Sequence, residues 1–120
     1  MKQMSDSQVI KGMRIRIYLG EASHFHHQAL YHAIVLKARE VGMAGATVFR
    51  AFEGFGPSSR IHSSNLLDLS SDLPMVIEII DNESKVEKFL EIVSPMLDHG
   101  MITTDPVTIF QYGHPSKRLE

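Results

Sequence analysis

The strongest constraint on the fold is a switch of hydrophobic period that occurs twice along the chain in the same order. Residues 13–19 alternate between apolar and polar side chains, which is the pattern of a half-buried strand. Further on, Leu30, Ile34, Ala38 and Val41 recur every three or four positions, which is the pattern of one helix face. A strand followed by a helix is therefore expected in the first part of the chain.

Small polar residues and glycines mark the ends of the next elements. Ser23 is expected to cap a helix that begins in the histidine cluster at residues 24–27, and Gly42 is expected to end it. Residues 45–52 predict a second strand. Residues 53–74 contain glycine, proline and several serines with little periodicity, so they predict a long loop of the kind that is usually functional or disordered.

The same order of strand and helix returns in the second half. Residues 75–80 predict a strongly apolar strand, and Asn82 is a suitable cap for the helix that follows. The apolar stripe of that helix contains Pro95, so its last turn is expected to be kinked or to end early. The final strand candidates are residues 101–104 and 107–112, which Asp105–Pro106 is expected to separate.

This order of elements predicts an α+β fold of the ferredoxin-like type, βαββαβ, in which an antiparallel sheet carries both helices on one face. We expect one domain over residues 13–112, a flexible lead-in at residues 1–12 and a tail at residues 113–120. A tight hairpin would suffice between the second and third strands, so the length of the 53–74 loop points to a function.

The composition argues against several classes of function. The chain has 14 acidic and 12 basic residues, a formal net charge of −2, which gives no basic excess for binding nucleic acid. Cysteine is absent, which excludes disulfides and cysteine-based zinc sites and fits a cytoplasmic location. No apolar stretch approaches the ~20 residues that span a bilayer, so direct membrane insertion is not expected.

The histidines offer two enzymatic or metal-binding alternatives. His24 and His27 are spaced to share a helix face and could bind a transition metal. A solvated helix start is the better interpretation, because no carboxylate or cysteine completes a familiar ligand spacing. A small hydrolase could use His62 or the same cluster, but the sequence contains no Gly-x-Ser-x-Gly elbow to support a serine nucleophile.

Glycines and arginines around the long loop suggest an anion site. Gly54 and Gly56 permit close backbone approach, and backbone N–H groups in such turns can cradle phosphate. Arg50 and Arg60 are natural bidentate partners for phosphate. Each residue alone is better explained as a turn glycine or a surface charge, so a site requires the fold to bring them together.

Several motifs together carry a resemblance to a known family. Residues 42–56 read Gly-Met-Ala-Gly-Ala-Thr-Val-Phe-Arg-Ala-Phe-Glu-Gly-Phe-Gly, which is similar to the signature around the second strand of PII proteins. Further matching segments are residues 17–21, 59–63, 69–74 and 76–81. Over about residues 13–112 the chain resembles the PII-like family catalogued as domain of unknown function 190, DUF190, in the nitrogen regulatory PII-like superfamily.

The resemblance implies a homotrimer that binds an adenine nucleotide in the clefts between subunits and needs no metal. The 53–74 loop corresponds to the PII T-loop, which docks on partner proteins, and a membrane transporter is the partner that the family suggests. The positions that match the family's nucleotide site are Gly45, Thr47, Val48, Arg50, Gly54, Gly56, Arg60, His62, Gly100, Met101, Ile102 and Thr103.

Departures from the family pattern narrow the choice of ligand. Met101 follows Gly100 where PII proteins carry a phosphate-binding lysine, and Lys117–Arg118 is a poor substitute for their basic C-terminal strand. The loop also lacks the tyrosine that PII proteins use for covalent modification. These differences favour AMP or ADP, or some other anion, over ATP in a non-enzymatic signalling protein. The alternative within the same fold is a metal-ion-binding trimer like the copper-tolerance proteins, although their cysteine and tryptophan are missing here.

Overall fold

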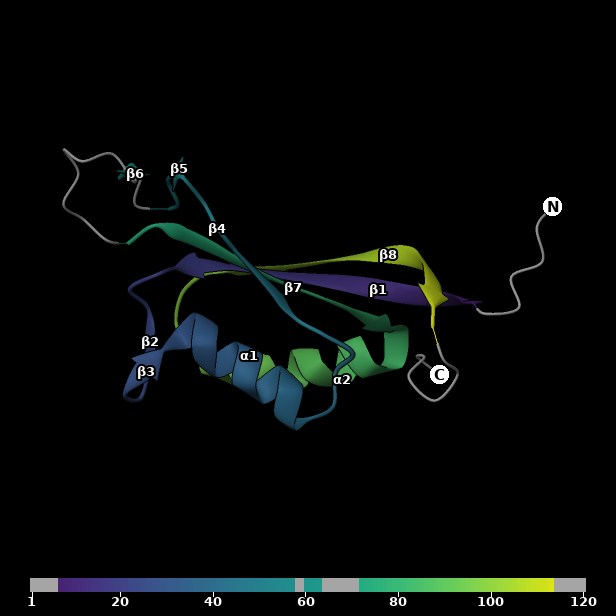
Figure 1. Cartoon of the computed structure of the whole chain (residues 1–120). Coiled ribbons are helices and arrows are strands. Elements are labelled where there is room, and N and C mark those ends of the chain that lie inside the picture. Colours follow the sequence, from purple (N-terminus) through teal and green to yellow (C-terminus); the bar gives the residue numbers. More distant parts are fainter. Residues whose placement is uncertain (1–6, 58–59, 64–71, 114–120) are drawn as a thin grey trace.

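The computed structural model (Figure 1) describes residues 7–57, 60–63 and 72–113, and its centre is an antiparallel four-stranded sheet with the strand order β4-β7-β1-β8. β-branched apolar residues recur along the two central strands, β1 and β7. This order and the two crossover helices are those of the ferredoxin-like fold, so the predicted fold class is confirmed. The sheet strands and helices are β1 (Ser7–Gly20), α1 (Leu30–Glu40), β4 (Thr47–Arg50), β7 (Pro74–Asn82), α2 (Glu83–Val93) and β8 (Met101–Tyr112).

Both helices cover the same face of the sheet, as Figure 1 shows. The alternation along β1 and β7 directs Ile15, Ile17, Ile77 and Ile79 toward the helices, where each is at most 1% exposed. Phe89 of α2 is fully buried in the same cluster. Burying each such side chain contributes about 1.5–3 kcal/mol, so this layer between sheet and helices forms the core.

The strand at each end of the chain is longer than the sequence pattern predicts. β1 begins at Ser7, so residues 7–12 belong to a strand rather than to a flexible lead-in, and residues 1–6 lie outside the described residues. β8 runs without interruption through Asp105–Pro106, which were expected to break it. The expectation was wrong because β8 is an edge strand, where a proline can be accommodated without losing a ladder bond on the inner side.

The histidine cluster does not belong to the first helix. It forms a small hairpin of β2 (His24–Phe25) and β3 (Gln28–Ala29), and α1 begins only at Leu30. The turn of the hairpin places His26 at a φ of 56°, a conformation outside a right-handed helix. His24 and His27 therefore do not share a helix face, and the geometric basis for a metal site there is removed.

The second helix and its end agree with the sequence more closely. The Asn82 side chain accepts a hydrogen bond from the backbone N–H of Lys85 at 3.0 Å, which confirms the predicted cap. After Val93 the chain tightens into a 3₁₀ turn, η1 (Ser94–Met96), which contains Pro95. The helix therefore ends early, as the proline predicted.

The long loop contains a short ladder at its base. β5 (Glu53–Gly54) pairs with β6 (His62–Ser63), with Gly54 opposite His62. β4, the strand before it, covers only part of the predicted range 45–52. Residues 58–59 and 64–71 of the predicted loop lie outside the described residues. The described end of the loop returns to the sheet at β7.

In the described part of the chain, the other face of the sheet is covered by neither helix (Figure 1). The strand register places Phe49, Val76, Tyr18 and Met101 side by side in one row across this open face. Phe49 and Met101, at the two ends of the row, are 50% and 55% exposed. Neither α-helix in the described part of the chain has the length and apolarity that a membrane span needs.

Candidate functional site

The predicted ligand residues fall into two groups at opposite edges of the sheet. Thr47, Val48 and Arg50 lie on β4, and Gly45 comes just before it. The run from Gly100 to Thr103 lies at the start of β8. Because β7 and β1 separate these edges, three strand spacings of about 4.8 Å put the groups about 14 Å apart. One chain does not bring them together.

The two groups nevertheless lie at the same end of the sheet. Arg50 pairs with Met75 of β7, which in turn pairs with Leu19 of β1. Met101 pairs with Tyr18, the residue next to Leu19. The two edges therefore carry their candidate residues at matching heights, which is the arrangement required if the edge of one chain faces the opposite edge of another.

A third group lies at the base of the long loop. Gly54 and His62 face each other in the β5–β6 ladder, and Arg60 is exposed just before it. Gly56 is exposed, and a side chain added there would meet open space. This group continues from the β4 edge, so it belongs with Arg50 rather than with the β8 residues.

Arg50 is held by a carboxylate that sequence reasoning missed. Its guanidinium binds both oxygens of Glu21, with Nε 3.1 Å from Oε2 and Nη2 donating to Oε1 at 3.1 Å. The Arg50 side chain is 56% exposed and that of Glu21 is 24% exposed. Arg50 is thus accessible to solvent, but a phosphate would have to share or replace Glu21.

The turn that carries Glu21 is fixed by the returning end of the loop. The backbone N–H of Glu21 donates to the carbonyl of Leu73 at 2.8 Å, and the N–H of Ala22 donates to Asp72 at 2.8 Å. Just after β4, the N–H of Ala51 donates to the carbonyl of Pro74 at 2.8 Å. These bonds hold Glu21 and the backbone beside Arg50 in one rigid frame.

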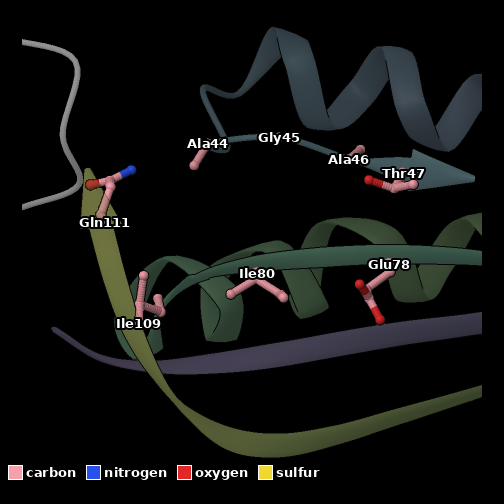
Figure 2. Close-up of a pocket in the computed structure, with 8 residues that line it drawn as sticks. All are labelled: Ala44, Gly45, Ala46, Thr47, Glu78, Ile80, Ile109 and Gln111. Atoms are coloured by element: carbon pink, nitrogen blue, oxygen red, sulfur yellow. The ribbon is translucent and has the colours of Figure 1, made fainter. Parts of the chain in front are cut away.

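A groove opens on the uncovered face beside Gly45 (Figure 2). Its volume is about 260 Å³, below the roughly 300–1,000 Å³ of pockets that enclose a drug-sized ligand. Small side chains make one wall and β8 makes the other. The residues that line it are Ala44, Gly45, Ala46, Thr47, Glu78, Ile80, Ile109 and Gln111.

A buried carboxylate positions the small-residue wall of this groove. Asp81 is fully buried and accepts hydrogen bonds from the backbone N–H groups of Ala44 at 2.9 Å and Asn82 at 2.7 Å. The bond to Ala44 joins the segment before β4 to β7, 37 residues further along. Asp81 therefore holds the segment that leads into β4, and this segment positions Gly45 and Thr47.

Asp81→Asn is expected to lower the free energy of unfolding by about 1–3 kcal/mol, because the amide NH₂ replaces one acceptor and faces a buried N–H donor. Urea unfolding followed by circular dichroism measures the change. Asp105→Asn is the matched control, since its side chain is 44% exposed in an ion pair with Arg14 and should cost under about 1 kcal/mol. Equal losses in the two variants would contradict the anchoring role.

The open face beside the groove carries paired charges. Arg16 donates from Nε to Glu78 at 2.8 Å, and Arg14 makes two hydrogen bonds to Asp105, at 3.1 and 2.7 Å. The hydrogen bond that Arg16 donates to the Glu78 carboxylate raises the pKa of the Arg16 guanidinium above its ordinary value. The face thus joins an apolar row to neutralised ion pairs, a mixture suited to contact with another protein surface.

The backbone conformation and close packing just before β8 require a glycine at position 100, whether or not a ligand binds there. Its φ is +111°, and a side chain there would lie 2.5 Å from the carbonyl oxygen of Tyr18. Ile102 packs against the core, while Met101 and Thr103 are exposed at the sheet edge.

Among residues 7–57, 60–63 and 72–113, no three His, Cys, Asp or Glu side chains gather where they could hold a metal ion.

Comparison with solved structures identifies the class of fold. CPII from Thiomonas intermedia K12, a nitrogen regulatory PII-like protein solved with ADP, AMP and bicarbonate, is 19% identical, with a TM-score of 0.64 over 92% of this chain and 95% of CPII. A putative PII-like signaling protein from Thermus thermophilus is 13% identical, with a TM-score of 0.56 over 88% of this chain and 93% of its own. The fold is therefore PII-like.

The family is narrower than the fold. The DUF190 family model, described as “Uncharacterized ACR”, matches residues 12–109. A UPF0166 protein from Aquifex aeolicus (strain VF5) is 39% identical over 101 residues, which cover 84% of this chain and 95% of that protein. The chain belongs to the DUF190 family, as its motifs indicated.

Proposed function

We propose that the protein is a PII-like regulatory protein that acts without catalysis, as a homotrimer that binds an adenine nucleotide between its subunits. The observation that carries the proposal is the placement of the candidate residues at opposite edges of one sheet and at the same height. A ligand that contacts both groups must lie between two chains. The open face, with its row of apolar residues that is exposed at both ends, supplies a surface on which the chains can associate.

The ligand class is supported by the solved PII-like structures. Complexes of CPII contain ADP with bicarbonate, and ADP and AMP with bicarbonate. In this chain Met101 follows Gly100, so a lysine for a third phosphate is missing from that position. We therefore propose AMP or ADP as the preferred ligand. The groove beside Gly45, too small for a nucleotide in one chain, would be completed by the neighbouring subunit.

The output of the protein is proposed to pass through the 53–74 loop to a partner protein, with a membrane transporter as the partner that the family suggests. Phe52 and Phe55, at the described base of the loop, are 75% and 68% exposed. Aromatic side chains presented in this way are typical of protein–protein contacts. Binding shifts the loop only if the nucleotide has different affinities for its conformations.

Calorimetric titration with AMP, ADP, ATP and cyclic AMP, after light scattering has fixed the oligomeric state, tests the proposal. We expect a trimer with one saturable site per subunit and the tightest binding for AMP or ADP. Arg50→Ala should weaken binding by about tenfold or more, because charge-assisted hydrogen bonds to phosphate contribute about 1.5–3 kcal/mol. No binding of any nucleotide would overturn the proposal, and saturable zinc or copper binding would favour the metal alternative.

A further inference from the structure

The strongest unexplained feature of the site is the fork-shaped contact between Arg50 and Glu21. Two guanidinium nitrogens face two carboxylate oxygens at 3.1 Å each. A phosphate group offers a guanidinium the same paired acceptors. The Glu21 carboxylate therefore occupies the position that a phosphate would take on Arg50.

We propose that Glu21 is a specificity-determining residue, a competitor built into the chain that a ligand must displace from Arg50 with a phosphate group. This inference rests on the proposed function. An adenosine moiety without phosphate leaves the ion pair intact, and only a phosphorylated ligand gains Arg50. Glu21 thus lowers the affinity for nucleotides while increasing the dependence of binding on phosphate.

The surroundings of Glu21 make such an exchange possible without moving the backbone. The N–H of Glu21 is bonded to Leu73, and its neighbour Ala22 is bonded to Asp72, so the turn keeps its shape when the side chain changes partner. Just after β4, the N–H of Ala51 donates to the carbonyl of Pro74. Only two side chains have to rearrange, and Arg50 is the more exposed of the two.

The exchange is also weakly opposed. An ion pair as exposed as this one contributes little to stability, because water solvates both groups once they separate. A phosphate carries more negative charge than the carboxylate it replaces, so Arg50 favours the exchange.

Glu21→Gln removes the competing charge but keeps the shape of the side chain and every backbone hydrogen bond of the turn. Calorimetry on the trimer is expected to show about three- to tenfold tighter binding of AMP and ADP than in the wild type, and unchanged binding of adenosine. In the Arg50→Ala background, Glu21→Gln should change the affinity for AMP by less than about twofold, because the guanidinium for which Glu21 and the phosphate compete is then missing.

Glu40→Gln is the matched control. Glu40 forms an ion pair with Lys37 at 2.8 Å at the end of α1, so this variant removes one charge of the same sign from a similar contact. It should leave all affinities unchanged. If Glu21→Gln does not alter AMP binding, or tightens adenosine equally, the inference is overturned while the proposed function stands. If no adenine nucleotide binds to the wild type or to either variant, both are overturned.

Discussion

Val76→Glu is expected to convert the proposed trimer into a monomer. Val76 lies in the middle of the open face, between Phe49 on β4 and Tyr18 on β1. If the open faces meet in the assembly, the substitution buries one carboxylate per subunit without a partner. We expect a loss of at least about 3 kcal/mol per subunit, which weakens association by more than about 100-fold.

Light scattering after size exclusion measures this change, and circular dichroism checks that the monomer keeps its fold. Ile92→Glu is the matched control: Ile92 is 38% exposed on α2, in the helical layer, and the variant should remain a trimer. Nucleotide binding should be lost with Val76→Glu and kept with Ile92→Glu, because only dissociation separates the two sheet edges. A folded Val76→Glu trimer would show that the open face is not the interface.

Elements with a complete local pattern could be predicted from the sequence. Residues 13–19 alternate, and residues 75–80 are apolar except for Glu78, because both segments are central strands under two helices. The cap at Asn82 and the early end at Pro95 are local signals of the same kind. Together these local signals predict the βαββαβ order without reference to any long-range contact.

Elements that depend on distant partners could not be predicted in this way. Residues 7–12 form a strand because they pair with the far end of β8, and the apolar pattern there is too short to be read alone. β8 continues through Pro106 because it lies at an edge, a property of topology rather than of sequence. The turn at His26 requires a positive φ, which the presence of a histidine in the sequence does not indicate.

The same distinction between local and long-range signals applies to the residues of the candidate site. Arg50 was predicted from its motif, but its partner Glu21 was not, since the two residues are 29 positions apart and meet only through the fold. Asp81, Ile109 and Gln111 were also missed, because a buried aspartate in an apolar strand and residues near the C-terminus match no motif. A polar residue that replaces an expected apolar one in a strand, as Asp81 does, was the one available signal.

Gly100→Ala is expected to lower the free energy of unfolding by about 2–6 kcal/mol. Its φ of +111° is a conformation that alanine rarely adopts, and the added methyl group would lie 2.5 Å from the carbonyl oxygen of Tyr18. Backbone strain and the forced shift of β1 against β8 each contribute about 1–3 kcal/mol. Because this cost arises within one chain, it should appear with and without nucleotide.

Urea unfolding at one fixed protein concentration measures the loss, since the stability of an oligomer depends on concentration. Gly45→Ala is the matched control: its added methyl group would meet nothing within 4 Å, so stability should change by less than about 1 kcal/mol. Gly45 lines the groove, however, so this variant should weaken nucleotide binding while the fold stays intact. A stable Gly100→Ala protein that has lost only nucleotide binding would instead make Gly100 a ligand-contacting glycine, as its motif first suggested.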